Sequence, residues 1–518
     1  MRTTRRARPA FLLSCAFSAI VALHAAAARA DDDEGRGERS RDGAGSGRLV
    51  VTRSVYPGTG RSPYPVPVII PGKTALPGGG TAVADGTYPN VFNNNKLDGS
   101  FGVTSPIYLD VLSASGHREK TLSIDVARAV TSFSSKSELA INRSQNGRAL
   151  TFMAYVAPVS TLDVSNSNTP NHVDPTNPVA LTYPRAVVQV DRDGKVRVTP
   201  VNGYSGNNGR AAVLAGNGLY YMAGNAGNGG TPQPTQIIDD TGVLMIAPGA
   251  GGEPVQVGTF SISQVIDPAT KLPYAPDKLG KDSNFRGLTV FDNTLYVTKG
   301  SGSNGIDTVY QVGSAGTLPT QAVSDNPGQG GNPTNMSILP GFPTQLAKSQ
   351  PGATGYYPFG LWFADANTLY VADEGDGTAA DATVSTHAGL QKWTRSNGIW
   401  QLAYVLQDGL GLGQSYSVSG LPASLNPSTD GLRNIAGRHN GDGTVTIYAV
   451  TSTISASGDQ GADPNRLVRI TDRLSYRTAA QAAGERFSTV QTARYGEVLR
   501  GVAVISGEGD DWFSGEDD

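Results

Sequence analysis

The sequence predicts an all-β protein, a single β-propeller with six four-stranded blades. Three observations predict it: a composition rich in turn residues, a short motif that recurs along the chain, and chain ends that complete one another. The chain has 518 residues, of which 65 are Gly and 32 are Pro, while only 16% are charged. Many short strands joined by turns fit this composition, and long helices do not.

The recurring motif is an Arg, a small residue and an apolar strand, followed after a turn by a second strand with a Tyr. In the fourth copy a Phe replaces the Arg. Successive copies are 62, 76, 73, 74 and 67 residues apart. They begin at Arg148, Arg210, Arg286, Phe359, Arg433 and Arg500.

A second hairpin follows the motif in some copies. Residues 187–196 and 390–400 are alternating strands broken by an Asp-Gly and an Asn-Gly turn. These dipeptides favour the tight turns of β-hairpins. Each repeat is therefore interpreted as four antiparallel strands, which is the blade of a propeller.

The two ends of the repeat region complement one another. Arg500 begins a first strand, after which the chain ends, whereas residues 49–55, 107–112 and 122–125 form three strands with no first strand. A blade shared by N- and C-terminal strands closes the ring and removes exposed sheet edges. We expect six blades, or seven if residues 319–350 hold a degenerate unit. Two separate β-sandwiches are the alternative, but they do not explain why the tail repeats the motif.

The first thirty residues have the pattern of a signal peptide. Four Arg precede an apolar run over residues 11–28, and Ala28-Arg29-Ala30 is a cleavage motif. The alternatives are an uncleaved anchor and a lipoprotein modified at Cys15. We expect a signal peptide at 1–30, a disordered leader at 31–47, the propeller at 48–506 with a loop insertion at 57–100, and an acidic tail at 507–518. This predicts an exported protein, periplasmic or secreted, without a membrane span in its mature form.

Charge and cysteine content narrow the classes of partner. Residues 1–30 hold five of the 41 basic residues and no acidic one. The rest of the chain therefore has a net charge of (41 − 5) − 44 = −8. This charge argues against nucleic acid as a partner. Cys15 is the single cysteine, so the mature chain is expected to contain no disulfide and no zinc–thiolate site. We expect a monomer.

Four short segments of the repeats are distinctive: 369–373 (LYVAD), 389–393 (GLQKW), 466–472 (RLVRITD) and 499–504 (LRGVAV). They resemble segments of exported bacterial β-propeller repeat proteins, most of which have no assigned activity. The resemblance covers roughly residues 48–506, and the insertion at 57–100 is longer than in many such proteins. It implies the fold and export, and it implies no chemistry.

The repeated Arg is the main candidate for ligand binding. The innermost strand of a blade lines the central channel, so residues that begin these strands lie near one mouth of the channel. Such a ring would bind a carboxylate or a phosphate. In the alternative, each Arg contacts an Asp or a backbone carbonyl of the next blade and fastens the blades together. The ring would consist of Arg148, Arg210, Arg286, Phe359, Arg433 and Arg500.

Acidic residues and two histidines are the other candidates. Oxygen ligands among glycines in loop 373–381 suit Ca²⁺, although a solvated acidic loop is the alternative. His387 and His439 are candidate proton shuttles. Asp430 could converge with the acidic loop as a carboxyl pair for glycoside hydrolysis, although no spacing argues for it. The acidic residues of the loop are Asp373, Glu374, Asp376 and Asp381.

These observations predict an exported binding protein that recognises a glycan, an anion or a surface protein at the channel mouth. A second hypothesis is an extracytoplasmic hydrolase or lyase acting on a polysaccharide or phosphoester. The Arg ring would then hold the anionic group, and His387 or His439 would work with an Asp. A structural envelope protein is the third hypothesis. No nucleophile elbow, P-loop or dinucleotide fingerprint is present, so the sequence alone leaves open whether the protein is an enzyme.

Overall fold

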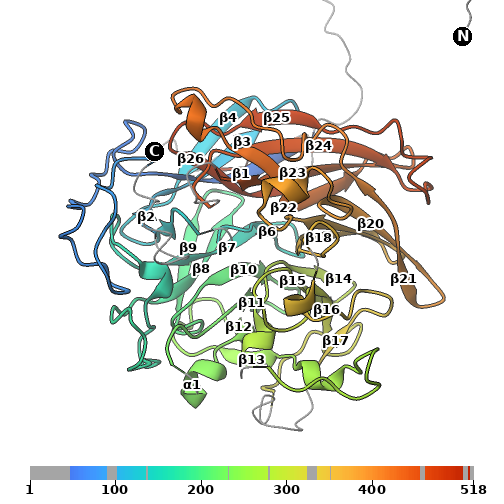
Figure 1. Ribbon diagram of the computed structural model, residues 1–518, viewed down its shortest axis with the longest axis horizontal. Helices are drawn as coiled ribbons and strands as arrows, with labels where there is room; N and C mark the ends of the chain where they lie inside the picture. The colour runs from blue at the N-terminus through green and yellow to red at the C-terminus, as the bar shows by residue number, and fades with distance from the viewer. Residues whose placement is uncertain are drawn as a thin grey trace, which may run out of the picture. The chain divides into compact units, whose positions relative to one another are not determined.

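The computed structural model describes residues 47–89, 102–135, 138–230, 233–277, 280–323, 335–350, 352–455, 461–505 and 512–513. The predicted signal peptide, almost all of the leader, residues 90–100 of the insertion and most of the acidic tail lie outside these residues. The described part forms six four-stranded antiparallel sheets around a common centre (Figure 1). The predicted six-bladed propeller is therefore confirmed.

Each blade has four strands, which follow one another from the centre of the ring outward. Blade 1 contains β26 (Glu497–Ile505), β1 (Arg48–Val55), β3 (Ile107–Leu112) and β4 (Arg118–Ser123). Blade 2 contains β6 (Asn142–Arg143), β7 (Ala149–Tyr155), β8 (Arg185–Asp191) and β9 (Val196–Val201). Blade 3 contains β10 (Gly209–Leu214), β11 (Tyr220–Gly224), β12 (Gly242–Ile246) and β13 (Val255–Gly258).

The other three blades follow the same order. Blade 4 contains β14 (Leu288–Phe291), β15 (Thr294–Lys299), β16 (Thr308–Val312) and β17 (Met336–Ile338). Blade 5 contains β18 (Pro358–Asp365), β19 (Thr368–Asp373), β20 (Gly389–Ser396) and β21 (Ile399–Leu406). Blade 6 contains β22 (Ser428–His439), β23 (Thr444–Ile454), β24 (Arg466–Arg473) and β25 (Ser488–Thr492). Since β17 completes blade 4, the described part of 319–350 belongs to that blade and forms no seventh one.

Short elements connect the blades. A two-stranded sheet joins β2 (Thr104–Ser105) to β5 (Thr131–Ser132). The helices are α1 (Thr235–Ile238), α2 (Ala379–Ala382) and the 3-10 turns η2 (Val164–Asn166), η3 (Ile262–Gln264), η4 (Lys281–Ser283), η5 (Ala347–Ser349) and η6 (Ala423–Leu425). No helix of the described chain is long and apolar enough to cross a membrane.

The ring closes as the chain ends predicted. In blade 1 the C-terminal β26 pairs antiparallel with the N-terminal β1 over its whole length, from Arg48 opposite Ile505 to Val55 opposite Glu497. The inner strand β22 of blade 6 contacts β26, so the last blade packs against the first. This pairing covers a strand edge that would otherwise be exposed.

Blade 2 differs from the prediction. The segment that begins at Arg148 is the second strand of this blade, and the short β6 is its inner strand. Arg148 lies exposed in the turn between β6 and β7. All seven residues of β7 are buried. Because β7 is buried on both faces, it is as apolar as an inner strand. The sequence motif therefore could not distinguish this second strand from an inner one.

Backbone contacts between blades identify the residue that replaces Arg148 in the ring. Glycines follow three ring positions, and a Cβ added to Gly287, Gly360 or Gly501 would lie 2.0, 2.5 or 2.4 Å from a carbonyl oxygen of the next blade. These oxygens belong to Phe359, Arg433 and Leu139. Leu139 is therefore the ring residue of blade 2. Inner strands pass so closely that only glycine fits at these points.

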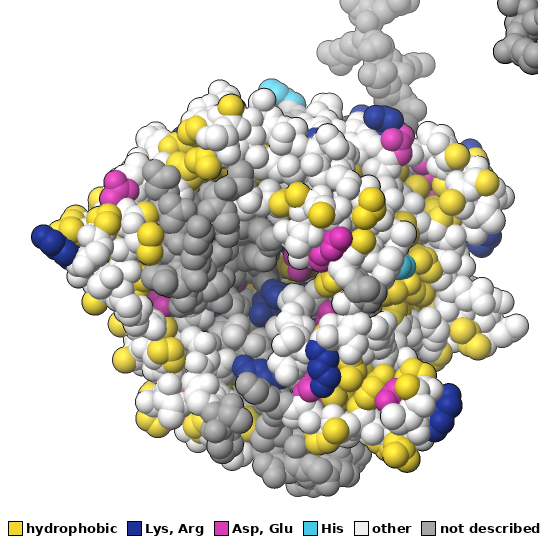
Figure 2. Space-filling model, in the orientation of Figure 1, with side chains coloured by type: hydrophobic (Ala, Val, Ile, Leu, Met, Phe, Trp, Pro, Cys, Tyr) yellow, Lys and Arg dark blue, Asp and Glu magenta, His cyan; other side chains and the backbone are white. Residues whose placement is uncertain are grey.

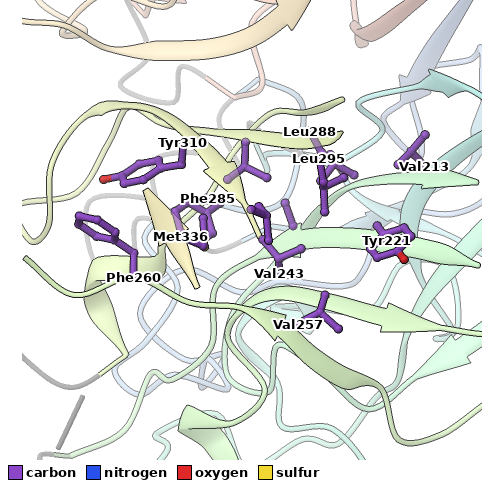
Figure 3. Packing of buried hydrophobic residues seen from close by; sticks show 14 of the residues in the cluster. Val213, Tyr221, Val243, Val257, Phe260, Phe285, Leu288, Leu295, Tyr310 and Met336 are labelled. Atoms are coloured by element: carbon purple, nitrogen blue, oxygen red, sulfur yellow. The ribbon is translucent and has the colours of Figure 1, made fainter. Parts of the chain in front are cut away.

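Apolar side chains fill the spaces between neighbouring blades. Between blades 3 and 4, buried residues of β12 and β13 pack against residues of β14, β15 and β16 (Figure 3). Examples are Val243, Val257, Leu288, Leu295 and Tyr310, each at most 3% exposed. This packing holds the inner strands in place and fixes the loops at the channel mouth.

Candidate functional site

Loops of blades 4, 5 and 6 enclose a cavity at one mouth of the channel. Within each antiparallel blade the second strand ends beside the start of the inner strand, as Asp373 lies opposite Pro358. The loops after β15 and β19 therefore lie at the same end of the blades as the first residues of the inner strands. These residues include Asp430 and Arg433 of β22. They line a cavity of about 380 Å³, here called the mouth pocket. Its polar side chains are Ser301, Ser303, Asp307, Tyr357, Glu374, Asp376, Asp430 and Arg433.

Charged side chains of both signs surround this mouth. Figure 2 shows acidic and basic groups around the hollow at the centre of the ring. The acidic residues outnumber the basic ones in the pocket lining, since four carboxyl groups face one guanidinium. The pocket therefore offers mainly hydrogen-bond acceptors to a ligand.

Asp430 is a buried acid with an oxygen to which no protein group donates a hydrogen bond. It lies near the start of β22, is 2% exposed, and accepts a hydrogen bond of 2.8 Å at Oδ2 from the amide of Gly377. Its Oδ1 is buried and has no hydrogen-bond partner. Burial, with the nearby carboxylates of Glu374 and Asp376, raises the pKa of Asp430 to about 8. At neutral pH the group therefore carries a proton that it can donate.

Glu374 and Arg433 form an ion pair across blades 5 and 6. Arg433 Nε donates a hydrogen bond of 3.0 Å to Glu374 Oε2, and the two residues are 5% and 8% exposed. The hydroxyl of Ser452 donates to the backbone carbonyl of Glu374 and fixes the loop. The pair neutralises the charge of Arg433, the single predicted ring arginine that lines the pocket.

Lys299 and Asp307 form a second ion pair, within blade 4. The ammonium of Lys299 lies 2.7 Å from Asp307 Oδ1 and also donates to the carbonyl of Ser301. Lys299 is fully buried. Burial raises the pKa of Asp307 to about 6 and lowers that of Lys299. This pair places Asp307 at the pocket wall with its counter-charge beside it.

The acidic loop after β19 does not act as one cluster. Asp373 is fully buried and accepts hydrogen bonds from the amides of Tyr357 and Gly375, and burial raises its pKa to about 7. Asp376 lines the pocket and accepts from Thr378. A hydrogen bond with Asp376 raises the pKa of Asp381, which lies on α2.

Calcium binding by this loop stays a prediction. In the part of the chain that the structure describes, no group of three or more His, Cys, Asp and Glu has the geometry to hold a metal ion. Glu374 faces Arg433, and Asp373 faces backbone amides. The carboxylates of loop 373–381 therefore do not converge on one point.

The arginines of the predicted ring contact protein groups, most of them in the adjacent blade. Arg210 donates to the side chain of Asn284 and, at 2.9 Å, to the carbonyl of Phe285, just before blade 4. Arg500 donates to the carbonyls of Phe133 and Ser135, just before blade 2. Together with the Arg433 pair, these contacts fit the alternative in which the arginines fasten neighbouring blades.

Arg286 contacts its own blade and the next one. Its guanidinium donates to the hydroxyl of Ser301 and lies 6.0 Å from the centre of the Phe359 ring. Phe359 is fully buried and belongs to blade 5. Arg286 therefore supports the pocket wall through Ser301 and does not itself line the pocket.

Neither predicted histidine lines the mouth pocket. The ring of His387 lies 4.0 Å from that of Tyr356, and burial lowers the pKa of this histidine. His439 is exposed at the end of β22, with Nε2 2.8 Å from the carbonyl oxygen of Ala364. Of the predicted catalytic candidates, Asp430 alone lies in the pocket.

Sequence reasoning missed Lys299, Ser301, Asp307 and Tyr357. One signal was present. Residues 295–299 (LYVTK) and 369–373 (LYVAD) occupy the same place in two repeats, so the segments that follow them reach the same mouth. A comparison of these loops would have predicted that Ser301 lies near the acidic loop. Asp307 and Tyr357 carry no such signal.

The buried acids predict that stability falls as pH rises. Folding retains a proton on Asp430 and Asp373, whose pKa values are about 8 and 7, while the unfolded chain releases it near pH 4. The folded state therefore binds more protons, and the free energy of unfolding decreases with pH. His172, whose hydrogen bond with Asp240 raises its pKa to about 9, acts in the same direction. Its contribution is complete below pH 6.5 and is lost as pH rises through about 9.

Guanidinium chloride unfolding between about pH 5 and pH 9 measures this slope. An Asp430→Asn variant is the control, because it should flatten the curve near its pKa of about 8. A stability that rises steadily toward pH 9 would contradict the buried, protonated state of these carboxyl groups.

Comparisons with known proteins yield structural similarity alone. No protein-family model and no curated protein matches the chain. The GH74 enzyme of Niastella koreensis is 12% identical over 71% of this chain and 47% of its own, with a TM-score of 0.28. The hemagglutinin-neuraminidase ectodomain of parainfluenza virus 5 is 10% identical over 70% and 74%, with a TM-score of 0.34. Inulosucrase from Halalkalicoccus jeotgali is 12% identical over 69% and 95%, with a TM-score of 0.25.

The match spans about half the length of the GH74 enzyme. Identities of 10–12% and TM-scores from 0.25 to 0.34 support no conclusion about the activity of this chain.

Proposed function

We propose that the protein binds a neutral glycan in the mouth pocket. The observation that carries this proposal is the lining of the cavity: four carboxyl groups, two serine hydroxyls and a tyrosine face one arginine that is already paired with Glu374. A ligand rich in hydroxyl groups can donate to the carboxylates and accept from Asp430. A volume of about 380 Å³ is in the range of small-molecule sites.

The same lining argues against an anionic ligand. Arg433 pairs with Glu374, Lys299 pairs with Asp307, and Arg210 and Arg500 donate to protein oxygens. A phosphate or carboxylate in the pocket would lie among four carboxyl groups, and the one guanidinium of the lining is already shared with Glu374. Of the ligands that the sequence predicted, a glycan therefore fits best.

Hydrolysis of a glycosidic bond is a second candidate function, favoured by the protonated Asp430. General-acid catalysis requires a carboxyl group that keeps its proton near neutral pH. In this mechanism Asp430 donates its proton to the glycosidic oxygen as the bond between that oxygen and the anomeric carbon breaks. A water molecule then adds to the anomeric carbon, and its proton passes to the Asp430 carboxylate. The carboxylate of Glu374 would stabilise the positive charge that develops on that carbon. The raised pKa of Asp430 in a pocket supports such a role.

Asp430→Ala tests binding. We expect hexaoses of glucose, xylose, mannose or N-acetylglucosamine to raise the melting temperature of the wild type, and phosphate, citrate and oligogalacturonate to have no effect. Asp430→Ala removes one hydrogen bond to the ligand, so we expect it to raise the dissociation constant about tenfold. Calorimetry measures this constant. Asp292→Ala, in the exposed β14–β15 turn, is the matched control. Equal affinity of both variants, or a response to anions alone, would contradict the proposal.

Asp430→Asn tests hydrolysis separately, because the amide keeps the shape of the side chain but cannot transfer the proton. If the protein is a hydrolase, release of reducing ends by the wild type falls above pH 8 and is lost in the variant, while binding persists. Unchanged turnover in Asp430→Asn would exclude Asp430 as the acid.

Export is part of the same proposal, on the basis of residues 1–30. Expression of the full chain with and without these residues, followed by cell fractionation, tests it. We expect the full chain outside the cytoplasm, and an identical distribution of both forms would contradict export.

A further inference from the structure

A second and larger cavity lies beside the mouth pocket, between blades 4 and 5. Its volume is about 700 Å³, and it is lined by the connection after β17 and by residues near Tyr274. Four aromatic side chains, Tyr274, Phe342, Tyr356 and Trp393, form part of its wall. We call it the aromatic pocket.

The aromatic residues of this pocket have two different roles. Phe342 and Trp393 are 5% and 3% exposed and stack with ring centres 3.9 Å apart, and the indole N–H of Trp393 donates to Gln391. They form a fixed floor. Tyr274 and Tyr356 are only half-buried, so their rings are accessible.

Polar side chains share the wall with these rings. Asp267, Thr344, Gln345 and Ser349 also line the cavity, and the last three are exposed. A wall with aromatic faces and polar groups matches a pyranose ring, which has apolar C–H faces and hydroxyl groups at its edge. Aromatic rings supply apolar contact area, and the polar groups give orientation.

One chain segment separates the two pockets. Leu346 lines the aromatic pocket and the next residue, Ala347, lines the mouth pocket. Tyr356 and Tyr357 are divided in the same way. Adjacent Cα atoms are about 3.8 Å apart, so the two cavities are neighbours.

We propose that the aromatic pocket is a second subsite for the ligand of the mouth pocket, and that this ligand is an extended oligosaccharide. The inference rests on the proposed function. It assigns Tyr274 and Tyr356 to contacts with sugar rings distant from Asp430. A monosaccharide occupies the mouth pocket alone, whereas a longer chain gains contact area in the aromatic pocket.

Calorimetric titration with sugars of one to six residues, from the hexaose series that stabilises the wild type, tests this inference. We expect affinity to rise with chain length. Tyr274→Ala should weaken hexaose binding about five- to tenfold through loss of buried apolar area and leave monosaccharide binding unchanged. Tyr476→Ala, a tyrosine outside both pockets, is the matched control.

The outcomes separate this inference from the proposed function. Affinity that is independent of length, with Tyr274→Ala equal to the wild type, would overturn the second subsite and leave the mouth pocket intact. Binding that depends on Tyr274 but not on Asp430 would overturn the mouth pocket, and with it the extended ligand. Absence of binding by every sugar would overturn both. Because Tyr274 is half-buried, a melting temperature measured without ligand verifies that each variant is folded.

Discussion

Replacement of Lys392 by Met is expected to lower the free energy of unfolding by about 3–5 kcal/mol, because it leaves a buried carboxylate without its counter-charge. Lys392 lies on β20 of blade 5 and Asp472 on β24 of blade 6, and both side chains are fully buried. Lys392 Nζ is 2.7 Å from Asp472 Oδ2. The substitution keeps most of the length of the side chain and removes its charge and its hydrogen-bond donors.

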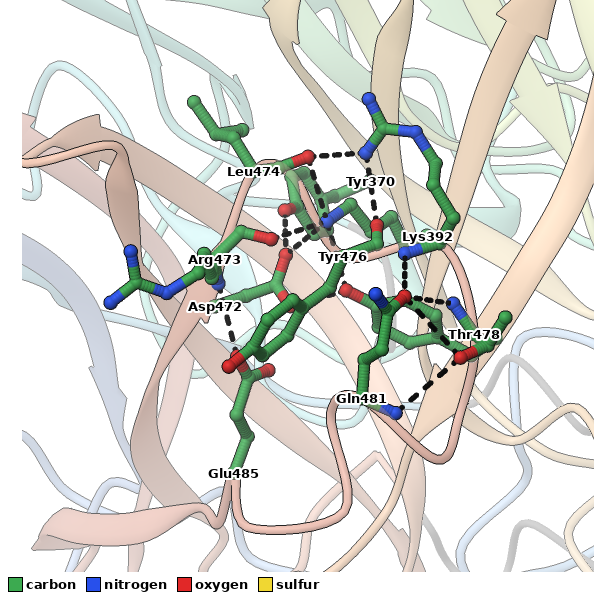
Figure 4. Close-up of polar contacts among 11 residues, drawn as sticks. Tyr370, Lys392, Asp472, Arg473, Leu474, Tyr476, Thr478, Gln481 and Glu485 are labelled. Carbon is green, nitrogen blue, oxygen red and sulfur yellow. Dashed lines mark hydrogen bonds and ion pairs between the residues drawn. The ribbon is translucent and has the colours of Figure 1, made fainter.

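Two tyrosines complete this network (Figure 4). The hydroxyl of Tyr404 donates to Asp472 Oδ1 at 2.5 Å and accepts from Lys392 at 2.8 Å, and Tyr370 also donates to Asp472. Lys392 donates further to the carbonyl of Arg473. In the variant the two tyrosine hydroxyls still donate to Asp472, but they are neutral and do not replace the positive charge of the ammonium.

Chemical denaturation measures the effect, with two comparisons. Lys195→Met, in the exposed β8–β9 turn, should change stability by less than about 0.5 kcal/mol. A Lys392→Met and Asp472→Leu double variant removes both charges and should cost less than the sum of the single variants. If Lys392→Met were as stable as Lys195→Met, the ion pair would not hold blades 5 and 6 together.

Replacement of Arg500 by Met is expected to lower the free energy of unfolding by about 3–6 kcal/mol, at about 1.5–3 kcal/mol for each of two hydrogen bonds to a charged group. Arg500 is 4% exposed, and its guanidinium donates to the carbonyls of Phe133 and Ser135. The variant leaves both carbonyl oxygens buried without these donors. Arg500 lies in β26, so the loss also weakens the blade that closes the ring.

Arg148→Met is the matched control for this prediction. The sequence motif places Arg148 in the same ring, but the structure places it in an exposed turn. We expect its substitution to change the melting temperature by less than one degree, and that of Arg500 to lower it by several degrees. Equal effects of both substitutions would contradict the role of the arginines in fastening the blades.

The fold could be predicted from the sequence because its signals are local and repeated. The Arg-Gly motif at Arg286 and Arg500, the Asn-Gly turn before Ile399 and the pairing of chain ends each depend on a few neighbouring residues. The prediction of the inner strand of blade 2 was wrong because β6 has only two residues, Asn142 and Arg143. A strand this short shows no sequence pattern. The next apolar strand took its place in the repeat.

The site could be predicted only in part. Asp430, Glu374 and Asp376 were named, and the fold brings them into one pocket. Other residues of the lining come from another blade: Asp307 and Ser301 lie about 70 residues before the acidic loop. Burial, which raises the pKa of Asp430 to about 8, is a property of the assembled ring. The same is true of the pairing that neutralises Arg433, and the ring was therefore first interpreted as an anion site.

Glycan binding is tested most directly by a crystal structure. Crystals of the protein are soaked with the hexaose that gives the largest rise in melting temperature. The account predicts a sugar residue in the mouth pocket within hydrogen-bond distance of Asp430 and Asp376, with the ion pair between Glu374 and Arg433 intact. A sugar bound away from the pocket, or an anion bound to a guanidinium released from its partners, would contradict it.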